Sequence, residues 1–351
     1  MTAVSSNWRT ASEATGFVLG VDVGGTKIAV AAVRGAEAHN RIEHQTELSS
    51  TSALLDGLEA TVREVIARTE SPAAIGVGVP SQIEYSTGRV ETSVNIPLTG
   101  VPLRAELGRR FGVPVFVDND ANCAALAEAQ LVPCDELVML TLGTGVGGGA
   151  IVGGRIFRGA HGLGAELGHF SVNPDGPHCP GNCPNRGCLE AYCSGQALER
   201  DATELAEDKP DSRLAGLLRT DGKVCGPDLV TAAEEGDPDA LLIFERFARM
   251  LGVGIAGYVN VFQPEHLVIG GGLSRASHLY LRRAVQEASA RALPALWRRV
   301  QISLARGGAD AGVIGAGVLA AQEVRDGRRI AHAGLRRDTG TAKTTGSKGV
   351  E

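Results

Sequence analysis

Two aspartates lie where a buried strand is expected to end, a position from which a carboxylate can act on a bound molecule. Asp22 falls in the apolar run 17–23, and Asp120 belongs to the polar triplet Asp118-Asn119-Asp120 after the run 113–117. A carboxylate placed in this way can accept the proton of an attacking hydroxyl group. Asp is also a favoured N-cap, so Asp120 has a second interpretation, as the cap of a helix over 121–129.

Two glycine-rich loops join pairs of apolar strands. The first is Gly24-Gly25-Thr26-Lys27, and the second runs from Gly143 through Thr144 and Gly145 to Gly149. Backbone N–H groups of such loops can converge on a phosphate, and glycine permits the close approach. The second loop fits the dinucleotide pattern G-x-G-x-x-G, but a strand follows where that fingerprint requires a helix, so we reject a dehydrogenase.

A third group of residues could hold a metal ion. Four of the seven cysteines cluster in the sequence: Cys179, Cys183, Cys188 and Cys193. No export signal precedes them, so a disulfide framework is not expected. Clustered thiols of regular spacing favour a metal site over free thiols in a loop.

The elements around these residues alternate between strands and helices. Apolar spacing predicts a helix over 52–68 with Ser52 as a possible cap, a strand at 74–79, a helix at 103–111, a mostly helical stretch over 197–259 and a strand at 267–269. This alternation indicates an α/β fold. Because strand, glycine loop and strand occur twice, we interpret the chain as two related domains whose glycine hairpins face each other across a cleft.

Composition excludes several classes of protein. Glycine accounts for 47 of the 351 residues, yet 43% of the chain is hydrophobic, so the glycines belong to loops of a folded protein. A net charge of -6 and a pI of about 5.8 argue against a nucleic-acid binder. No apolar run approaches the length of a membrane span. We expect a cytoplasmic protein, without nucleic-acid or membrane partners, with a flexible start at 1–16 and a disordered tail at 331–351.

In order and spacing, the motifs resemble those of the ROK family of bacterial sugar kinases and repressors. The matching segments are Asp22 to Lys27, Asn119-Asp120-Ala121-Asn122, Leu142 to Gly145, Gly164 to His169, Cys183 to Glu190 and Val268 to Gly272. The likeness is strongest to glucokinases of the actinobacterial type. It implies an actin-like, hexokinase-like ATPase fold of the ribonuclease H-like class. The expected domains are 17–118, completed by a C-terminal helix near 312–330, and a larger domain at 119–311.

The resemblance implies a role for each motif in transferring a phosphoryl group from ATP to a hexose, with glucose as the default substrate. Asp120 is then the base on the 6-hydroxyl, and Asn119 contacts neighbouring hydroxyls. Asp22 faces Mg²⁺ and the phosphates. Lys27 is equally well explained as a solvated hairpin lysine. The phosphate and adenosine contacts are expected from Gly24, Gly25, Thr26, Lys27, Thr144, Gly145, Gly271 and Gly272.

The family pattern also places residues around the hexose. They are Ser81, Asn95, Asn119, Asp120, Glu166, His169 and Glu190. Ser81 departs from the usual glycine of the family: it either supplies the same backbone contact or adds a hydroxyl that changes the sugar preference.

The same resemblance implies a structural zinc ion on a loop over 169–190. Its four ligands are His169, Cys179, Cys183 and Cys188, and His169 would also reach a sugar hydroxyl. Three residues separate Cys179 from Cys183, more than in the family pattern, and His178 is a competing ligand. The first thiol ligand is therefore open.

Two other functions fit the sequence less well than a kinase. A sugar-sensing ROK regulator would carry a helix-turn-helix domain, which the residues before 17 are too few to form. A sugar-binding protein without turnover would not need Asp120 and both phosphate loops. The residues do not separate glucose from kanosamine, mannose or N-acetylmannosamine, ATP from polyphosphate, or a homodimer from a homotetramer.

Overall fold

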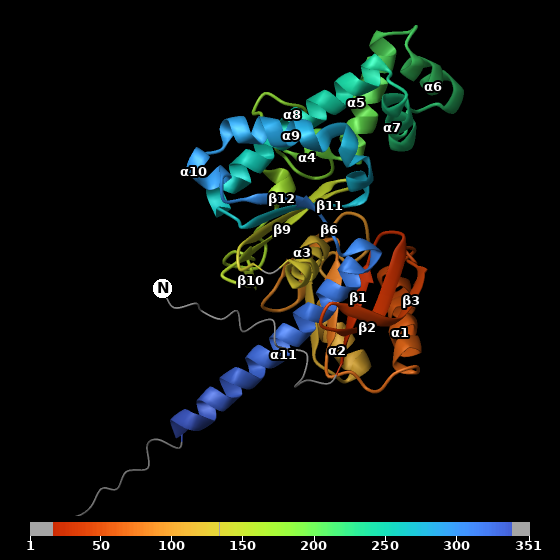
Figure 1. Ribbon diagram of the computed structural model, residues 1–351. Coiled ribbons are helices and arrows are strands. Elements are labelled where there is room, and N and C mark those ends of the chain that lie inside the picture. Colours follow the sequence, from red (N-terminus) through yellow and green to blue (C-terminus); the bar gives the residue numbers. More distant parts are fainter. Residues whose placement is uncertain (1–16, 133, 339–351) are drawn as a thin grey trace, which may run out of the picture.

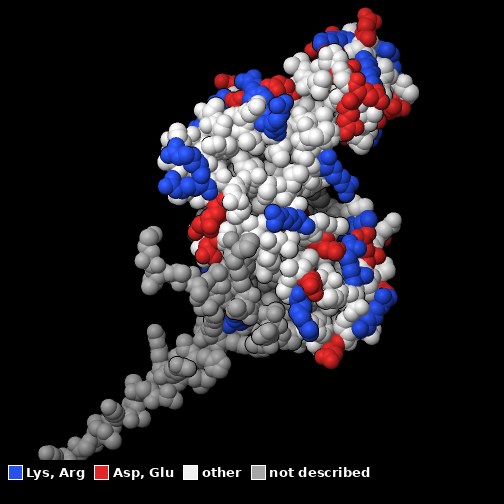
Figure 2. Space-filling model, in the orientation of Figure 1, with Lys and Arg blue, Asp and Glu red and all other residues white. Residues whose placement is uncertain are grey.

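The computed structural model describes residues 17–132 and 134–338, and it consists of two α/β domains (Figure 1). The expectations for 1–16 and 339–351 lie outside the described residues. Acidic and basic side chains are mixed over both domains on the face shown in Figure 2, without one basic surface. None of the described helices is long and apolar enough to cross a membrane.

The first domain is built on a five-stranded sheet in the order β3-β2-β1-β4-β7. β1 pairs antiparallel with β2, whereas β4 and β7 run parallel to β1. A two-stranded hairpin, β5 with β6, extends from this domain. The elements are β1 (Val18–Val23), β2 (Lys27–Arg34), β3 (Glu37–Gln45), α1 (Thr51–Ile66), β4 (Ile75–Val79), β5 (Ser81–Glu84), β6 (Arg89–Ser93), α2 (Leu103–Phe111) and β7 (Val115–Asn119).

The second domain repeats this strand order as β10-β9-β8-β11-β12. β8 and β9 form the antiparallel hairpin, and β11 and β12 run parallel to β8. The repeated glycine hairpins therefore correspond to a repeated sheet, as the sequence predicts. The strands are β8 (Leu137–Leu142), β9 (Val146–Val152), β10 (Arg155–Ile156), β11 (His266–Gly270) and β12 (Gln301–Leu304).

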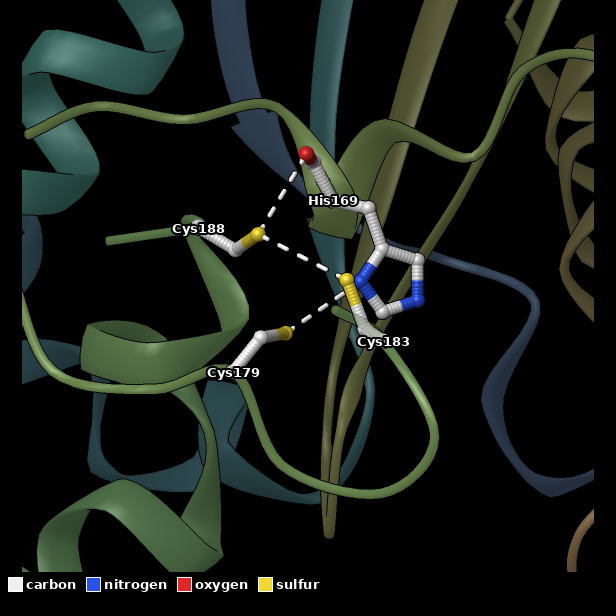
Figure 3. Close-up of side chains that lie close together, drawn as sticks. All are labelled: His169, Cys179, Cys183 and Cys188. Atoms are coloured by element: carbon white, nitrogen blue, oxygen red, sulfur yellow. Dashed lines mark hydrogen bonds between the residues drawn. The ribbon is translucent and has the colours of Figure 1, made fainter. Parts of the chain in front are cut away.

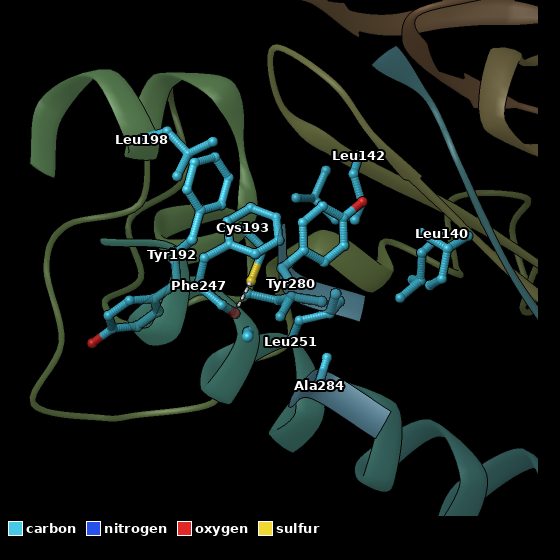
Figure 4. Close-up of a cluster of buried hydrophobic side chains, with 14 of the residues drawn as sticks. Leu140, Leu142, Tyr192, Cys193, Leu198, Phe247, Leu251, Tyr280 and Ala284 are labelled. Atoms are coloured by element: carbon cyan, nitrogen blue, oxygen red, sulfur yellow. Dashed lines mark hydrogen bonds between the residues drawn. The ribbon is translucent and has the colours of Figure 1, made fainter. Parts of the chain in front are cut away.

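Helices cover the second sheet and supply the largest apolar cluster. Phe247 of α8 and Tyr280 of α9 have ring centroids 4.7 Å apart, and both belong to one buried cluster with Leu142 and Leu251 (Figure 4). The mostly helical stretch predicted over 197–259 is confirmed. The helices of this domain are α4 (Glu190–Cys193), α5 (Gly195–Asp208), α6 (Arg213–Asp221), α7 (Gly226–Glu234), α8 (Pro238–Phe262), α9 (Ser277–Arg291) and α10 (Pro294–Trp297).

The last helix, α11 (Ala311–Asp338), returns to the first domain. It packs directly on β1 and β4 because both strands carry a glycine there: a Cβ at Gly20 would lie 1.8 Å from the Val313 carbonyl oxygen, and one at Gly76 would lie 1.7 Å from that of Ala316. α11 also packs against α3 (Asp120–Leu131), which joins the two sheets.

Three expectations about element boundaries need correction. α11 continues to Asp338, into the segment from 331 that low apolar periodicity predicts to be disordered. The cap of α1 is Ser50, whose hydroxyl accepts from the Ala53 amide, and not Ser52. Asn119 still pairs with Val79 in the first sheet, so the strand predicted at 113–117 continues to Asn119.

Candidate active site

The two predicted carboxylates lie close enough for the charge of Asp120 to act on Asp22. Asp22 lies on β1 and Asp120 is the first residue of α3. Burial, and then the negative charge of Asp120, raise the pKa of Asp22 to about 6, against a smaller opposing effect of Arg41. Burial also raises the pKa of Asp120. Two neighbouring carboxylates with raised pKa values are suited to acid–base work and to a divalent cation.

The first turn of helix α11 packs against Asp22. The Asp22 carboxylate lies against Gly312, where a Cβ would stand 2.2 Å from Oδ2. Only glycine leaves room for the carboxylate at this place. The close approach was not visible in the sequence, because it joins the first strand to a helix almost three hundred residues away along the chain.

Asn119, and not Asp120, is the N-cap of α3. Its Oδ1 accepts from the amides of Ala121 at 2.9 Å and Asn122 at 3.3 Å. The second interpretation of Asp120 therefore fails, since the capping position is occupied by its neighbour. Asp120 Oδ1 accepts from the Ala121 amide at 2.8 Å, which fixes the carboxylate at the helix start.

A pocket opens beside this helix start, between the two domains. Its walls come from the start of β5, from α3, from β9 and from the loop that follows β10. The predicted residues Ser81, Asn119 and Glu166 all line it, and burial raises the pKa of Glu166. The lining residues are Ser81, Gln82, Ile83, Asn119, Asn122, Gly147, Gly148 and Gly162 to Glu166.

The Ser81 hydroxyl is engaged within the protein. It donates to Ser93 Oγ at 2.8 Å, and the Ser81 carbonyl accepts from Asn119 Nδ2 at 3.3 Å. Of the two alternatives for Ser81, the structure favours a backbone role over an added sugar-facing hydroxyl.

The remaining predicted sugar residues are not among those that line the pocket. Asn95 is exposed beside Gly25. His169 and Glu190 are near enough to influence the charge of Glu166, as Asp120 is. Their contacts with a sugar stay predictions.

Glu190 connects the second glycine loop to the rest of the site. Its Oε2 accepts from the Val146 amide at 2.7 Å, and a Cβ at Gly145 would lie 2.5 Å from that oxygen. Gly271, with φ +82°, packs against the backbone of Leu142 just before this loop. The structure thus places Gly271 beside Leu142, two residues before Thr144.

The first glycine loop is closed by backbone hydrogen bonds. The Gly24 amide donates to the Lys27 carbonyl at 2.8 Å, and Thr46 Oγ1 donates to the Gly24 carbonyl at 2.7 Å. The Lys27 ammonium lies 2.6 Å from Glu43 Oε1 on the exposed edge. This geometry favours the solvated lysine over a phosphate contact.

The four predicted thiol and imidazole groups converge (Figure 3). One ligand atom from each of His169, Cys179, Cys183 and Cys188 lies within 4.8 Å of the others. His169 Nδ1 is 3.3 Å from Cys179 Sγ, while the other ring nitrogen points away from the sulfurs. His178 instead contacts the Arg186 guanidinium, so the geometry favours Cys179 as the first thiol of the set.

Sequence reasoning missed several residues of the site. Gln82 lines the pocket and its side chain hydrogen-bonds Glu166. Asn122 also lines the pocket. It belongs to the motif Asn119-Asp120-Ala121-Asn122, so the sequence could have indicated it as a site residue. Asp118 forms a buried ion pair with Arg158, which no local pattern indicates.

The chain is similar to known sugar kinases over most of its length. The chain is 37% identical over 316 residues to a glucokinase of Halalkalibacterium halodurans, which covers 88% of this chain and 96% of that protein. It is 35% identical over 305 residues to a glucokinase of Thermotoga maritima, covering 85% and 95%. A solved ROK family glucokinase from Streptomyces griseus, in complex with glucose and AMPPNP, superposes with a TM-score of 0.74 at 34% identity, covering 88% of this chain and 100% of that chain.

The duplicated sheets and the cleft between them, together with these relatives, define a sugar kinase with the actin-like ATPase fold. The family model matches residues 18–323. The chain belongs to the ROK family.

Proposed function

We propose that this kinase transfers a phosphoryl group from ATP to the 6-hydroxyl of glucose, with Asp120 as the base. The observation that carries the proposal is the placement of Asp120 at the start of α3, beside a pocket that Asn119 and Glu166 line. The relatives named glucokinase favour glucose among the hexoses.

The chain's own residues can perform the acceptor half of the reaction. Asp120 is held at the α3 start and has a raised pKa, so its carboxylate can take the hydroxyl proton as the oxygen attacks. Asn119, Gln82 and Glu166 offer hydrogen-bonding groups to ring hydroxyls. A sugar lacking the matching hydroxyl would leave such a group unpaired, which is the usual origin of sugar selectivity.

The donor half depends on the two glycine loops. Their backbone amides, at Gly24-Gly25 and at Thr144-Gly145, are suited to phosphate oxygens, and the Gly271-Gly272 turn lies beside the second loop. Mg²⁺ brought with the nucleotide neutralises phosphate charge, and Asp22 is the carboxylate we propose to face it. The raised pKa of Asp22 fits a carboxylate that awaits a cation.

We also propose that His169, Cys179, Cys183 and Cys188 hold a structural zinc ion. The donor set of one imidazole and three thiols matches a closed tetrahedral site, and its ligand atoms already lie close together. Such a site fixes a loop and does not catalyse. Here the loop leads to Glu190, which supports the second glycine loop.

The proposed assembly is a homodimer, with a homotetramer as the alternative, in the cytoplasm where ATP is supplied. Three exposed apolar side chains, Phe157, Val261 and Leu293, together with the half-buried Phe262, are hereafter the Val261 patch and support association. Val261 is 72% exposed and Leu293 58% exposed. Exposed apolar groups gathered in this way mark association surfaces. The rings of Phe157 and Phe262 pack edge to face at 6.3 Å, and the Leu293 amide donates to Asn260, next to Val261.

A coupled assay for ADP tests the function. The protein is supplied with Mg-ATP and, in turn, glucose, mannose, kanosamine and N-acetylmannosamine, and then with polyphosphate in place of ATP. We expect the highest kcat/KM for glucose with ATP. A higher kcat/KM for an amino or epimeric hexose would overturn the substrate assignment, and the absence of ADP with every hexose would overturn the kinase.

A further inference from the structure

One buried ion pair crosses between the two domains beside the pocket. Arg158, just after β10 of the second domain, donates from Nε to Asp118 Oδ2 of β7 at 2.7 Å. The side chains are 16% and 2% exposed. A pair removed from water to this extent is costly to break, because the remaining charge is left without compensation.

Both partners of this pair are held by further contacts. Arg158 stacks on the Tyr85 ring, with Cζ 3.6 Å from the ring centroid, and the Tyr85 hydroxyl donates to Glu323 of α11 at 2.6 Å. The planar guanidinium can lie flat on the ring while the N–H groups at its edge donate, a geometry that a compact ammonium does not offer. The sequence therefore needs arginine here, and not merely a positive charge.

Each partner also governs one wall of the sugar pocket. Asp118 Oδ1 accepts from the Asn119 amide at 2.8 Å and from Asn122 Nδ2 at 2.9 Å, so it fixes two residues that line the pocket from the first domain side. On the other side, the Arg158 carbonyl accepts from the Gly164 amide at 2.9 Å. This bond folds the segment 159–166, which ends at Glu166.

The same segment is pressed against the first domain at a second place. Gly162 has φ +88°, and a Cβ there would lie 2.6 Å from both the Tyr85 amide nitrogen and the Tyr85 Cβ. Tyr85 thus contacts the segment at Gly162 and stacks under Arg158. These contacts set the distance between the wall that carries Glu166 and the wall that carries Asn119.

We propose that Arg158 is a positioning residue for the hexose. Its ion pair with Asp118 holds the segment 159–166, which ends at Glu166, in a fixed position relative to the start of α3. The inference rests on the proposed function. Glu166 contacts the sugar both before and during transfer, so loss of its position weakens hexose binding more than turnover. Within the described residues, the ion pair and ring contact of Arg158 go to Asp118 and Tyr85 of the first domain and not to a glycine loop, so we expect nucleotide binding to be unchanged.

The test compares Arg158→Met with Arg155→Met as the matched control. Arg155 lies three residues earlier and pairs with Asp326 of α11 at 3.0 Å, but its side chain is 75% exposed. We expect Arg158→Met to raise the KM for the hexose about tenfold or more, with kcat and the KM for ATP changed by less than about threefold, the pattern of lost ground-state binding. Arg155→Met should match the wild type in all three.

A double variant separates positioning from simple stability. Asp118→Asn keeps an oxygen for the two donors it serves and removes the uncompensated charge. In Asp118→Asn/Arg158→Met we therefore expect the melting temperature to recover toward the wild type while the KM for the hexose stays raised. The double variant also keeps the test valid if Arg158→Met alone fails to fold.

Two results would overturn the proposal. One is a wild-type KM for the hexose in Arg158→Met, and the other is a KM that recovers together with stability in the double variant. Failure of the proposed function is distinct, because the wild-type protein itself would then form no sugar phosphate.

Discussion

Asp120 and Asp22 are the residues at which burial has a direct chemical consequence. Burial raises the pKa of each carboxylate, and the negative charge of Asp120 raises the pKa of Asp22 further. A base whose pKa lies nearer to neutrality takes a hydroxyl proton more readily than an exposed aspartate does.

This shift predicts the direction of the pH dependence. Both carboxylates must be ionised, Asp120 to accept the proton and Asp22 to face the cation, so activity falls as the pH drops through about 6. We expect kcat/KM for Mg-ATP, measured at saturating glucose, to decrease at least about tenfold per pH unit below this value. A profile that stays flat down to pH 5 would contradict the assignment of these carboxylates.

Single residues were predictable where a motif named them. Asp120, Asn119, Glu166 and the four clustered thiol and imidazole residues were all expected from the sequence, and the structure brings them near the pocket or to one another. The engagement of Ser81 with Ser93, of Lys27 with Glu43 and of Arg158 with Asp118 was not predictable, since each depends on which distant side chain folding places opposite.

At the scale of elements, the loop over 169–190 connects the proposed zinc site to catalysis. Cys188 lies two residues before Glu190, whose carboxylate accepts from the start of β9 next to Gly145. A metal that fixes the cysteines therefore also fixes the support of the second glycine loop.

Removal of a ligand should damage both the fold of the loop and the use of ATP. We expect about one zinc ion per chain by elemental analysis, as for a closed four-ligand site. Cys183→Ser should lose the zinc, lower the melting temperature and raise the KM for ATP. Cys225→Ser, which alters a cysteine beside Asp228 and outside the cluster, is the control. Stable, fully active protein without metal would refute the structural role.

The strands and helices with regular apolar spacing were predicted well, and α2 at Leu103–Phe111 agrees with its predicted range. The start of α1 was misplaced because Ser50 and Ser52 are equally good caps and only the local backbone chooses between them. The length of α11 was missed because its last turns lack an apolar stripe.

At the scale of the molecule, two sheets of equal strand order surround one cleft, and α3 and α11 pack against each other where the domains meet. The repeated glycine hairpins made this duplication predictable. The distance between the domains was not predictable, because it depends on contacts between residues far apart in the chain, such as Arg158 and Asp118. A cleft of this kind can close on the sugar and exclude water from ATP.

The Val261 patch makes a prediction about assembly. Val261→Asp combined with Leu293→Asp places charge on an apolar surface that a second copy would cover, so we expect the dimer to dissociate in analytical ultracentrifugation. Leu242→Asp, at a side chain that is 57% exposed on the first turns of α8, should leave the assembly unchanged. A double variant with the mass of the wild-type assembly would exclude this surface as the interface.

The substitution Asp120→Asn tests whether Asp120 is the base of this hexose kinase. The amide retains an oxygen for the Ala121 amide but cannot take a proton, so kcat should fall by about a hundredfold or more while the calorimetric Kd for glucose changes less than about threefold. Asp56→Asn, on the exposed face of α1, should keep wild-type turnover. If Asp120→Asn retained most of the wild-type kcat, Asp120 would not be the base.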